Sequence, residues 1–424
     1  MNIGHDMHAF VARLFPICRS LTGEGTRETL RIIKGHLPDL SIHEVPSGTQ
    51  VFDWVIPDEW NIRSATLVGP DGATVADFGW TNLHVVGYSE PVDVELGLDE
   101  LQEHLFSLPE QPDAIPYVTS YYKRFWGFCL SHRVRAALKP GTYRARIDST
   151  IAPGRLSYGE LLIPGQEPQE VFLSTNVCHP SMANNELSGL TVTTWLAKWL
   201  LERPRRYSYR IVFIPETIGS ITYLSRHLEQ MKERVVAGFV VACVGDERVY
   251  SFLSSRNGNT LADRVARHVL DQIDPNYMRY SFLNRGSDER QYCAPGVDLP
   301  VVSVMRSKYC EYPEYHTSLD DLTLVTPAGL EGGYTALRRC IEVIESNRRW
   351  QVAVLGEPQL GKRGLFPSIS LPAEVPSVKA MMNMIAYCDG TRDLVEVAEL
   401  IGVPAWQLVP ICERLASHDL LRVA

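Results

Sequence analysis

Residues 170–204 form the stretch EVFLSTNVCHPSMANNELSGLTVTTWLAKWLLERP, which indicates the fold most directly. It begins with an apolar run that predicts a buried strand, and from Leu187 it continues with a pattern that predicts a helix. The loop between them contains His179, Asn185 and Glu186 in quick succession. The stretch therefore predicts a strand–loop–helix unit that carries polar side chains directly after its strand.

The same alternation of strand and helix continues along the chain. Apolar segments typical of buried strands recur as YRIVFIPE (209–216), AGFVVACVGD (237–246) and LPVVSVMR (299–306). Helical patterns separate them, as in ITYLSRHLEQMKERV (221–235) and TLADRVARHVLDQI (260–273). Apolar strands that alternate with helices form parallel sheets covered on both faces. We therefore predict the α/β fold class, with a mixed, mostly parallel sheet and helices on both faces.

Two other regions have a different composition. Residues 46–115 contain short β-rich runs broken by Pro, Gly and Asp-Gly, which predicts a small inserted β-rich domain. Residues 352–424 begin with a Pro- and Gly-rich linker and continue with three short helical patterns and a terminal strand, which predicts a winged-helix domain. The α/β domain is then discontinuous and consists of residues 1–45 and 116–351.

Composition and charge limit the partners. The chain has 424 residues and a net charge of −9, which argues against nucleic acid as a partner. In the recognition-like helix 405–417 of the predicted winged helix, Arg414 is the only Lys or Arg, so we expect protein contacts or dimerisation from it instead of DNA binding. No apolar run reaches about 18 residues, so no membrane partner is expected.

The cysteines and the first residues predict a location. The nine cysteines are scattered and form no CxxC pair, which is typical of reduced thiols. The first segment, MNIGHDMHAFVARLF, lacks the basic start and long apolar core of a signal peptide. We therefore predict a cytoplasmic protein.

Four polar residues follow strands or lie downstream of the last one. His179, Glu216 and Asp246 each come at the end of a predicted strand, and His316 lies in YPEYHTSLDDL (312–322). In open α/β sheets the functional residues gather at the carboxyl ends of the strands. Any one of these residues alone is most simply an isolated surface group. Two histidines and two acids from four segments together favour a zinc site with a general base.

Several motifs carry a family resemblance. HPSMANNELSG (179–189), PETIGS (215–220) and YHTSLDDL (315–322) resemble the M28-type zinc aminopeptidases. A closer resemblance, to the DUF4910/DUF2172 aminopeptidase-like branch, runs nearly end to end and includes RSLTGEGTRETL (19–30) and GSDERQYCAPGVDLPV (286–301). It implies a zinc-exopeptidase-like α/β domain interrupted by a small β-rich module, with a winged helix at the end.

The resemblance also implies roles for single residues. It makes His179 and Asp246 ligands of a first zinc, His316 a ligand of a second, and Glu216 the general base. Asn185 stands where the M28 enzymes have an aspartate that bridges two zinc ions.

Two positions depart from the M28 pattern. Thr217 stands where those enzymes have a glutamate ligand of the second zinc, and it belongs to the closer branch's own PETIGS pattern. Asn185 departs from both, because the closer branch has Ala-Asn-Asp here. An amide oxygen brings no charge to a metal, and zinc prefers imidazole, thiolate and carboxylate. We therefore predict one zinc ion as the cofactor, held more weakly than it would be with aspartate at position 185.

Substrate-binding candidates lie in other loops. Arg290, in RGSDERQYC (285–293), is a candidate to bind a substrate carboxylate through its guanidinium fork, and an internal ion pair is the alternative. Arg256 is a weaker candidate of the same kind. Tyr312 and Tyr315, beside His316, are candidates to line a pocket.

The function predicted from these features is amide hydrolysis. We expect a zinc-dependent aminopeptidase or related amide hydrolase that acts on a short peptide or amino-acid conjugate, with a zinc-activated water and Glu216 as general base. Asn185 and Thr217 favour an alternative, a metal-depleted, non-catalytic binding or scaffold protein on a peptidase fold. A winged-helix regulator with a ligand-sensing domain is a further alternative, which the acidic charge opposes. The sequence leaves a homo-oligomer open.

Overall fold

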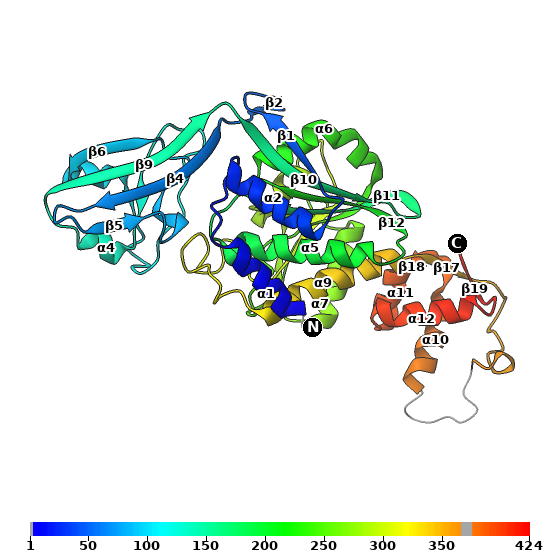
Figure 1. Cartoon of the computed structure of the whole chain (residues 1–424). Helices are drawn as coiled ribbons and strands as arrows, with labels where there is room; N and C mark the ends of the chain where they lie inside the picture. Colours follow the sequence, from blue (N-terminus) through cyan, green and yellow to red (C-terminus); the bar gives the residue numbers. More distant parts are fainter. Residues whose placement is uncertain (1–2, 366–374) are drawn as a thin grey trace. The chain divides into compact units, whose positions relative to one another are not determined.

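The chain forms two compact units (Figure 1). The computed structural model describes residues 3–365 and 375–424. One unit consists of Met1–Gly258 and Met278–Tyr334, and the other of Asn259–Tyr277 and Thr335–Ala424. The last of the three boundaries between the units therefore falls inside helix α9 (Pro327–Ser346).

The first unit contains an eight-stranded sheet with the order β1-β10-β12-β11-β13-β16-β14-β15. These strands are β1 (Ser41–Pro46), β10 (Arg155–Ile163), β12 (Tyr207–Ile214), β11 (Glu167–Asn176), β13 (Val235–Val240), β16 (Val301–Met305), β14 (Ser251–Leu253) and β15 (Met278–Tyr280). The pairs β11–β12, β11–β13, β13–β16 and β14–β15 are parallel, and the other three are antiparallel. The predicted mixed, mostly parallel sheet is confirmed.

Helices cover both faces of this sheet. Helix α5 (Ser188–Leu201) connects β11 to β12, and helix α6 (Ile218–Arg234) connects β12 to β13. The two connections cross the sheet in opposite directions, so right-handed crossovers place the two helices on opposite faces. Helices α1 (Ile3–Leu14) and α2 (Glu24–His36) pack beside α5 (Figure 1).

The amphipathic pattern of α1 explains its packing. Met7, Phe10, Val11 and Leu14 are buried, and their spacing places them on one face of the helix.

A second sheet forms the β-rich module of the first unit. Its order is β5-β4-β9-β6. These strands are β4 (Glu59–Val68), β5 (Thr74–Asp77), β6 (Val92–Gly97) and β9 (Thr142–Ala152). The sequence prediction ended this module at residue 115, whereas its strand pairing continues to Ala152 because β9 lies between β4 and β6. The alternation of exposed and buried residues along β9 fits one face packed on the module's core.

Short elements complete the first unit. They are β2 (Gln50–Val51), β3 (Trp54–Val55), β7 (Leu105–Phe106), β8 (Phe128–Cys129), α3 (Leu98–Leu101), α4 (His132–Ala136) and α8 (Glu289–Tyr292). The β2–β3 hairpin and the segment 116–122 both reach the cavity described below.

The second unit contains the predicted winged helix. Its elements are α7 (Leu261–Ile273), β17 (Arg349–Val352), α10 (Val375–Tyr387), β18 (Asp389–Asp393), α11 (Leu394–Ile401), α12 (Ala405–Ala416) and β19 (Leu421–Val423). The strands form a sheet with the order β18-β17-β19. Part of the predicted linker, residues 366–374, lies outside the described residues.

Two contacts attach α7 to the winged helix, although the sequence placed residues 259–277 in the α/β domain. The Arg264 guanidinium pairs with the Asp393 carboxylate at 2.7 Å. The Ala405 N–H donates to Nε2 of His268 at 2.9 Å, and burial lowers the pKa of His268, which keeps that nitrogen an acceptor.

The described residues contain no single helix that is long and apolar enough to cross a membrane; α11 and α12 meet those limits only when counted together across a bend of 113°. All nine cysteines are reduced thiols, and Cys310 is the exposed one.

Gly189, at the start of α5, packs closely against the backbone of Val241. A Cβ on Gly189 would lie 2.1 Å from the Val241 carbonyl oxygen, whereas one on Gly35, in α2, would meet nothing within 4 Å. We expect Gly189→Ala to lower the free energy of unfolding by about 1–3 kcal/mol, and Gly35→Ala to raise it by about 0.5–1 kcal/mol. Urea unfolding of both variants measures the difference. Equal stabilities would show that α5 does not begin against this backbone.

Candidate active site

A cavity of about 480 Å³ lies beyond the carboxyl ends of β11 and β12 in the first unit. Four of the predicted site residues line it, namely His179, Glu216, Arg290 and His316. Its remaining wall is largely aromatic and apolar, and includes Leu21, Trp54, Tyr117, Tyr121, Tyr122 and Ile218. Burial keeps the pKa of Tyr117 and Tyr121 well above the ordinary value, so both phenols are neutral. The structure therefore brings together two imidazoles, one carboxylate and one guanidinium.

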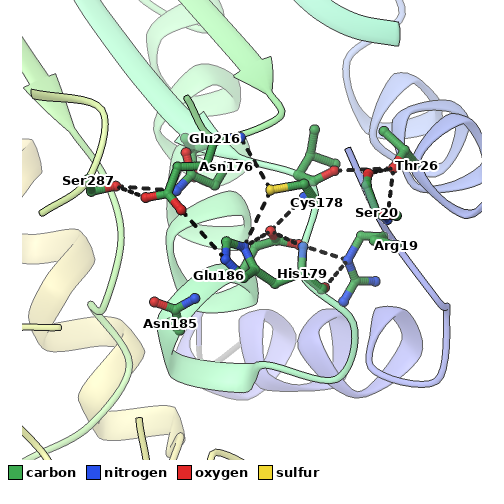
Figure 2. Close-up of polar contacts among 12 residues, drawn as sticks. Arg19, Ser20, Thr26, Asn176, Cys178, His179, Asn185, Glu186, Glu216 and Ser287 are labelled. Carbon is green, nitrogen blue, oxygen red and sulfur yellow. Dashed lines mark hydrogen bonds and ion pairs between the residues drawn. The ribbon is translucent and has the colours of Figure 1, made fainter. Parts of the chain in front are cut away.

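His179 is oriented by a buried carboxylate. Its Nδ1 lies 2.8 Å from Oε2 of Glu186, on the π-helical turn Ala183–Leu187 (Figure 2). The same oxygen accepts from the backbone N–H groups of Cys178 (2.6 Å) and His179 (2.5 Å). With Nδ1 held in this way, Nε2 is left facing Glu216, whose Oε2 is 3.6 Å away. A histidine oriented through one ring nitrogen presents the other to a ligand.

Arg19 neutralises the buried charge of Glu186. Its Nε donates to Oε1 of Glu186 at 2.8 Å and to the His179 carbonyl oxygen at 3.0 Å. Neither the Arg19 nor the Glu186 side chain is exposed. Burial alone would raise the pKa of Glu186, but His179 and Arg19 outweigh it and lower that pKa, so Glu186 is ionised. The sequence alone does not predict the Arg19–Glu186 ion pair, because no regular spacing relates residues 19 and 186.

Among the described residues, one group of three His, Cys, Asp or Glu side chains has ligand atoms within 4.8 Å of one another. It consists of Cys178, His179 and Glu186. Two observations argue against a metal among them. Oε2 of Glu186 already accepts three hydrogen bonds. Burial raises the pKa of Cys178 to about 11, so its sulfur is a thiol and not the thiolate that binds metals. The group therefore supports His179, and the Cys178 side chain is buried.

His316 provides a second imidazole with an unused nitrogen. Its ring stacks on Tyr315 (centroids 3.9 Å apart, planes 12° apart) and lies 5.4 Å from the His179 ring. Its Nε2 is buried and has no hydrogen-bond partner among the described residues. Burial lowers the pKa of His316 to about 3, so the ring is neutral near pH 7. A buried nitrogen without a partner is costly, and an ion in the cavity would provide one.

Glu216 is fixed by Ser287. Oε1 of Glu216 accepts from the Ser287 hydroxyl at 2.7 Å (Figure 2), which leaves Oε2 on the side of His179. The next residue, Thr217, has φ 65° and ψ −78°, and the Ile218 N–H donates to the Glu216 carbonyl at 2.8 Å. This is a tight γ-turn, a strained conformation for a threonine.

The segment 286–290 holds this strained turn in place. The Thr217 N–H donates to Oδ1 of Asp288 at 2.7 Å, and the Arg290 Nη2 donates to the Thr217 hydroxyl at 2.9 Å. The sequence predicts substrate capture by this charged loop through Arg290. Ser287 and Asp288 lie in the same motif, RGSDERQYC, but its pattern does not indicate their roles.

Two predicted metal ligands do not line the cavity. Asp246 is 1% exposed, and its two oxygens accept four hydrogen bonds, from the Asn184 amide, the Arg248 N–H and the Ser307 N–H and hydroxyl. Asn185 is buried; its N–H donates to Asp320, and its Oδ1 lies 3.9 Å from the Cys243 sulfur. Figure 2 shows Asn185 apart from the bonded group around His179, with no contact drawn to it.

Three predicted substrate-binding residues also lie outside the cavity lining. Tyr312 donates to Asp320, Tyr315 stacks on His316, and Arg256 forms an ion pair with Asp298. The aromatic lining comes from Trp54 and from the segment 117–122 instead. The cluster of tyrosines in YVTSYY was the available signal for this segment.

The fold is shared with solved zinc aminopeptidases. BSAP, a zinc aminopeptidase from Bacillus subtilis, matches with a TM-score of 0.58 at 12% identity, over 80% of this chain and 94% of that chain. The predicted M28-type, zinc-exopeptidase-like fold is therefore confirmed.

Closer comparisons define the family. The model of the family described as Domain of unknown function (DUF4910) matches residues 8–347, and a winged helix-turn-helix model matches residues 348–423. The chain belongs to the DUF4910 family. A Clostridium acetobutylicum protein, named as a candidate for polysaccharide biosynthesis with an aminopeptidase-like domain, is 41% identical over 99% of this chain and 96% of its own length. The crystal structure of a candidate peptidase from Clostridium acetobutylicum matches with a TM-score of 0.94 at 40% identity, over 99% and 96% of the two chains.

The Arg19–Glu186 pair gives a prediction for stability. We expect Arg19→Met to lower the free energy of unfolding by about 3–5 kcal/mol, because it leaves a buried carboxylate without its cation. The exposed Arg63–Asp148 pair is the matched control, and Arg63→Met should change the free energy of unfolding far less. Denaturant unfolding measures both. Similar losses in the two variants would show that the buried pair does not hold this loop.

Asp288 gives a prediction for pH dependence. Burial, and then the nearby Glu216, raise the pKa of Asp288 from its ordinary 3.8 to about 7. Between pH 4 and 7 the folded protein therefore keeps a proton that the unfolded chain releases, and stability falls as the pH rises. Asp288→Asn removes this titration. The free energy of unfolding of the wild type, relative to this variant, should decline from pH 4 to pH 7; parallel pH curves would contradict it.

Proposed function

We propose that the protein is a zinc-dependent amide hydrolase with an aminopeptidase-like fold, acting on a short peptide or amino-acid conjugate. The observation that carries the proposal is the buried, partnerless Nε2 of His316. It belongs to a ring 5.4 Å from that of His179, which is itself oriented by Glu186 toward the free oxygen of Glu216.

The donor set favours one zinc ion. His179 and His316 are imidazoles, the ligands that favour zinc over magnesium. The four hydrogen bonds to the Asp246 carboxylate argue against it as a ligand. Position 185 remains the predicted third ligand, and the Asn185→Asp variant tests that prediction.

Glu216, Ser287 and Glu186 would each have a different role in the reaction. When bound, zinc supplies Lewis acidity, which polarises a carbonyl group and acidifies a water. Glu216 takes the proton of the attacking water on Oε2 and gives it to the leaving amine. Ser287 keeps Oε1 occupied, so a single oxygen of Glu216 faces the reaction. Glu186 fixes the ring of His179 and never contacts the substrate in this scheme.

The alternatives have less support. Asn185 and Thr217 favour a metal-depleted scaffold protein, but the organised Glu216 and the unused His316 nitrogen favour catalysis. For a DNA-binding regulator, α12 offers only Arg414, which donates to the Gly364 carbonyl at 3.2 Å. The relative named for polysaccharide biosynthesis adds amino-acid–sugar conjugates to the substrates worth testing.

Metal content and turnover test the proposal together. We expect about one zinc per chain by elemental analysis, retained in Glu216→Gln and lost in His316→Ala. Glu216→Gln should slow amide hydrolysis by about 100- to 10,000-fold, the usual effect of losing a general base. His5→Ala, at an exposed position of α1, is the control that keeps both properties.

Three outcomes would count against parts of this scheme. Equal zinc in the wild type and His316→Ala would remove His316 from the ligands. Equal rates in the wild type and Glu216→Gln would remove the base. Equal zinc affinity in the wild type and Asn185→Asp would show that residue 185 is not a ligand.

A further inference from the structure

The charges that line the cavity constrain the substrate. Among the lining residues that the structure describes, Glu216 is the only carboxylate and Arg290 the only guanidinium. A substrate with a free α-ammonium needs an anionic partner, and a substrate with a free carboxylate needs a cationic one. The charges in the lining can therefore distinguish a substrate with a free ammonium group from one with a free carboxylate.

Arg290 is positioned but not neutralised. Its Nε donates to the Ser287 carbonyl at 3.0 Å and its Nη2 donates to the Thr217 hydroxyl at 2.9 Å. Both acceptors are uncharged, and Arg290 forms no ion pair among the described residues. Two other arginines of this unit differ, because Arg256 pairs with Asp298 and Arg248 with Glu314. A held guanidinium without an internal anion can bind a carboxylate.

Among the described residues that line the cavity, no carboxylate is free to pair with an ammonium group. Oε1 of Glu216 is occupied by Ser287, and Oε2 faces His179, where the general base must work. The phenol oxygens of Tyr117 and Tyr121 lie 2.7 Å apart and hydrogen-bond to each other. In the part of the chain that the structure describes, the cavity lining contains no second carboxylate to hold an α-ammonium.

The position of Arg290 indicates which end of the substrate it binds. Arg290 is tied to Thr217, the residue next to Glu216. In the proposed reaction, Glu216 delivers a proton to the leaving amine, so the leaving group lies on the side of Glu216 and Arg290. The acyl group then lies toward the aromatic and apolar wall that includes Tyr117 and Leu21.

We infer that the substrate is an N-acyl-α-amino acid, with Arg290 binding the carboxylate of the amino acid that is released. This inference rests on the proposed amide hydrolysis. Water adds its oxygen to the acyl carbon and the C–N bond breaks: RCO–NH–CHR′–COO⁻ + H₂O gives RCOO⁻ and H₃N⁺–CHR′–COO⁻. Both protons of the water end on the leaving nitrogen, and Glu216 finishes in its initial state.

Ligand binding to the full-length Glu216→Gln protein tests this inference without turnover. The probes are the N-acetyl derivatives of leucine, phenylalanine, glutamate and lysine, each as the α-carboxylate and as the α-carboxamide, together with L-leucinamide as a free-amine probe. We expect at least one carboxylate to bind about 10- to 100-fold more tightly than its carboxamide, the range for a hydrogen bond to a charged group. L-Leucinamide should bind more weakly than that carboxylate.

Adding Arg290→Gln to Glu216→Gln should abolish the preference for the carboxylate. Arg290→Lys should retain part of it, because lysine keeps the charge and loses the fork. Arg285→Gln is the matched control, an exposed arginine of the same loop that does not line the cavity. The comparison of carboxylate with carboxamide binding to the Glu216→Gln protein involves no substitution at Arg290. It therefore remains valid even if Arg290→Gln fails to fold.

The outcomes separate this inference from the proposed function. Equal affinity for carboxylate and carboxamide, or binding of no carboxylate probe at millimolar concentration, would overturn the assignment. Turnover by the wild type without carboxylate preference would leave hydrolysis standing and remove the substrate class. Carboxylate preference without turnover by the wild type would keep the Arg290 site and remove the hydrolytic function.

Discussion

The buried carboxylate of Glu186 sets the arrangement of the loop that carries His179. Burying a charge is costly unless it is paired and hydrogen-bonded. Here two backbone N–H groups, the His179 ring and Arg19 all converge on Glu186. The loop after β11 is therefore folded around one group. Because Arg19 lies just after α1 in the chain, the same ion pair joins the N-terminal segment to the site.

A second constraint acts on Glu216. The chain leaves β12 through a strained turn at Thr217, and such turns persist only where the surroundings hold them. The segment 286–290 does so through Asp288 and Arg290, while Ser287 fixes the carboxylate itself. The candidate base is thus positioned by a segment some 70 residues later in the chain. Its geometry depends on the packing of the loop before β16.

The sequence predicted the parts of the site that follow from strand periodicity. His179 and Glu216 come directly after apolar strands, and parallel pairing brings strand ends to one edge. Asp246 also follows a strand, but its oxygens are occupied by hydrogen bonds, because a strand end fixes where the backbone goes and not whether an oxygen is free. The partners of Glu186 and the role of Ser287 depend on long-range contacts that no local spacing encodes. The extent of the β-rich module was missed because the polar, alternating strand β9 lacks the apolar run used to find core strands.

Thr217 links the proposed metal site to the proposed anionic substrate. In the M28 enzymes that the sequence resembles, a glutamate stands at this position, and the threonine removes one negative charge from the cavity. A cavity with fewer anions suits a second metal ion or a substrate ammonium less well. The threonine hydroxyl also accepts a hydrogen bond from Arg290 and holds the guanidinium at the cavity. One side chain thus lowers the negative charge of the site and helps to place a positive one, and both effects favour an anionic substrate.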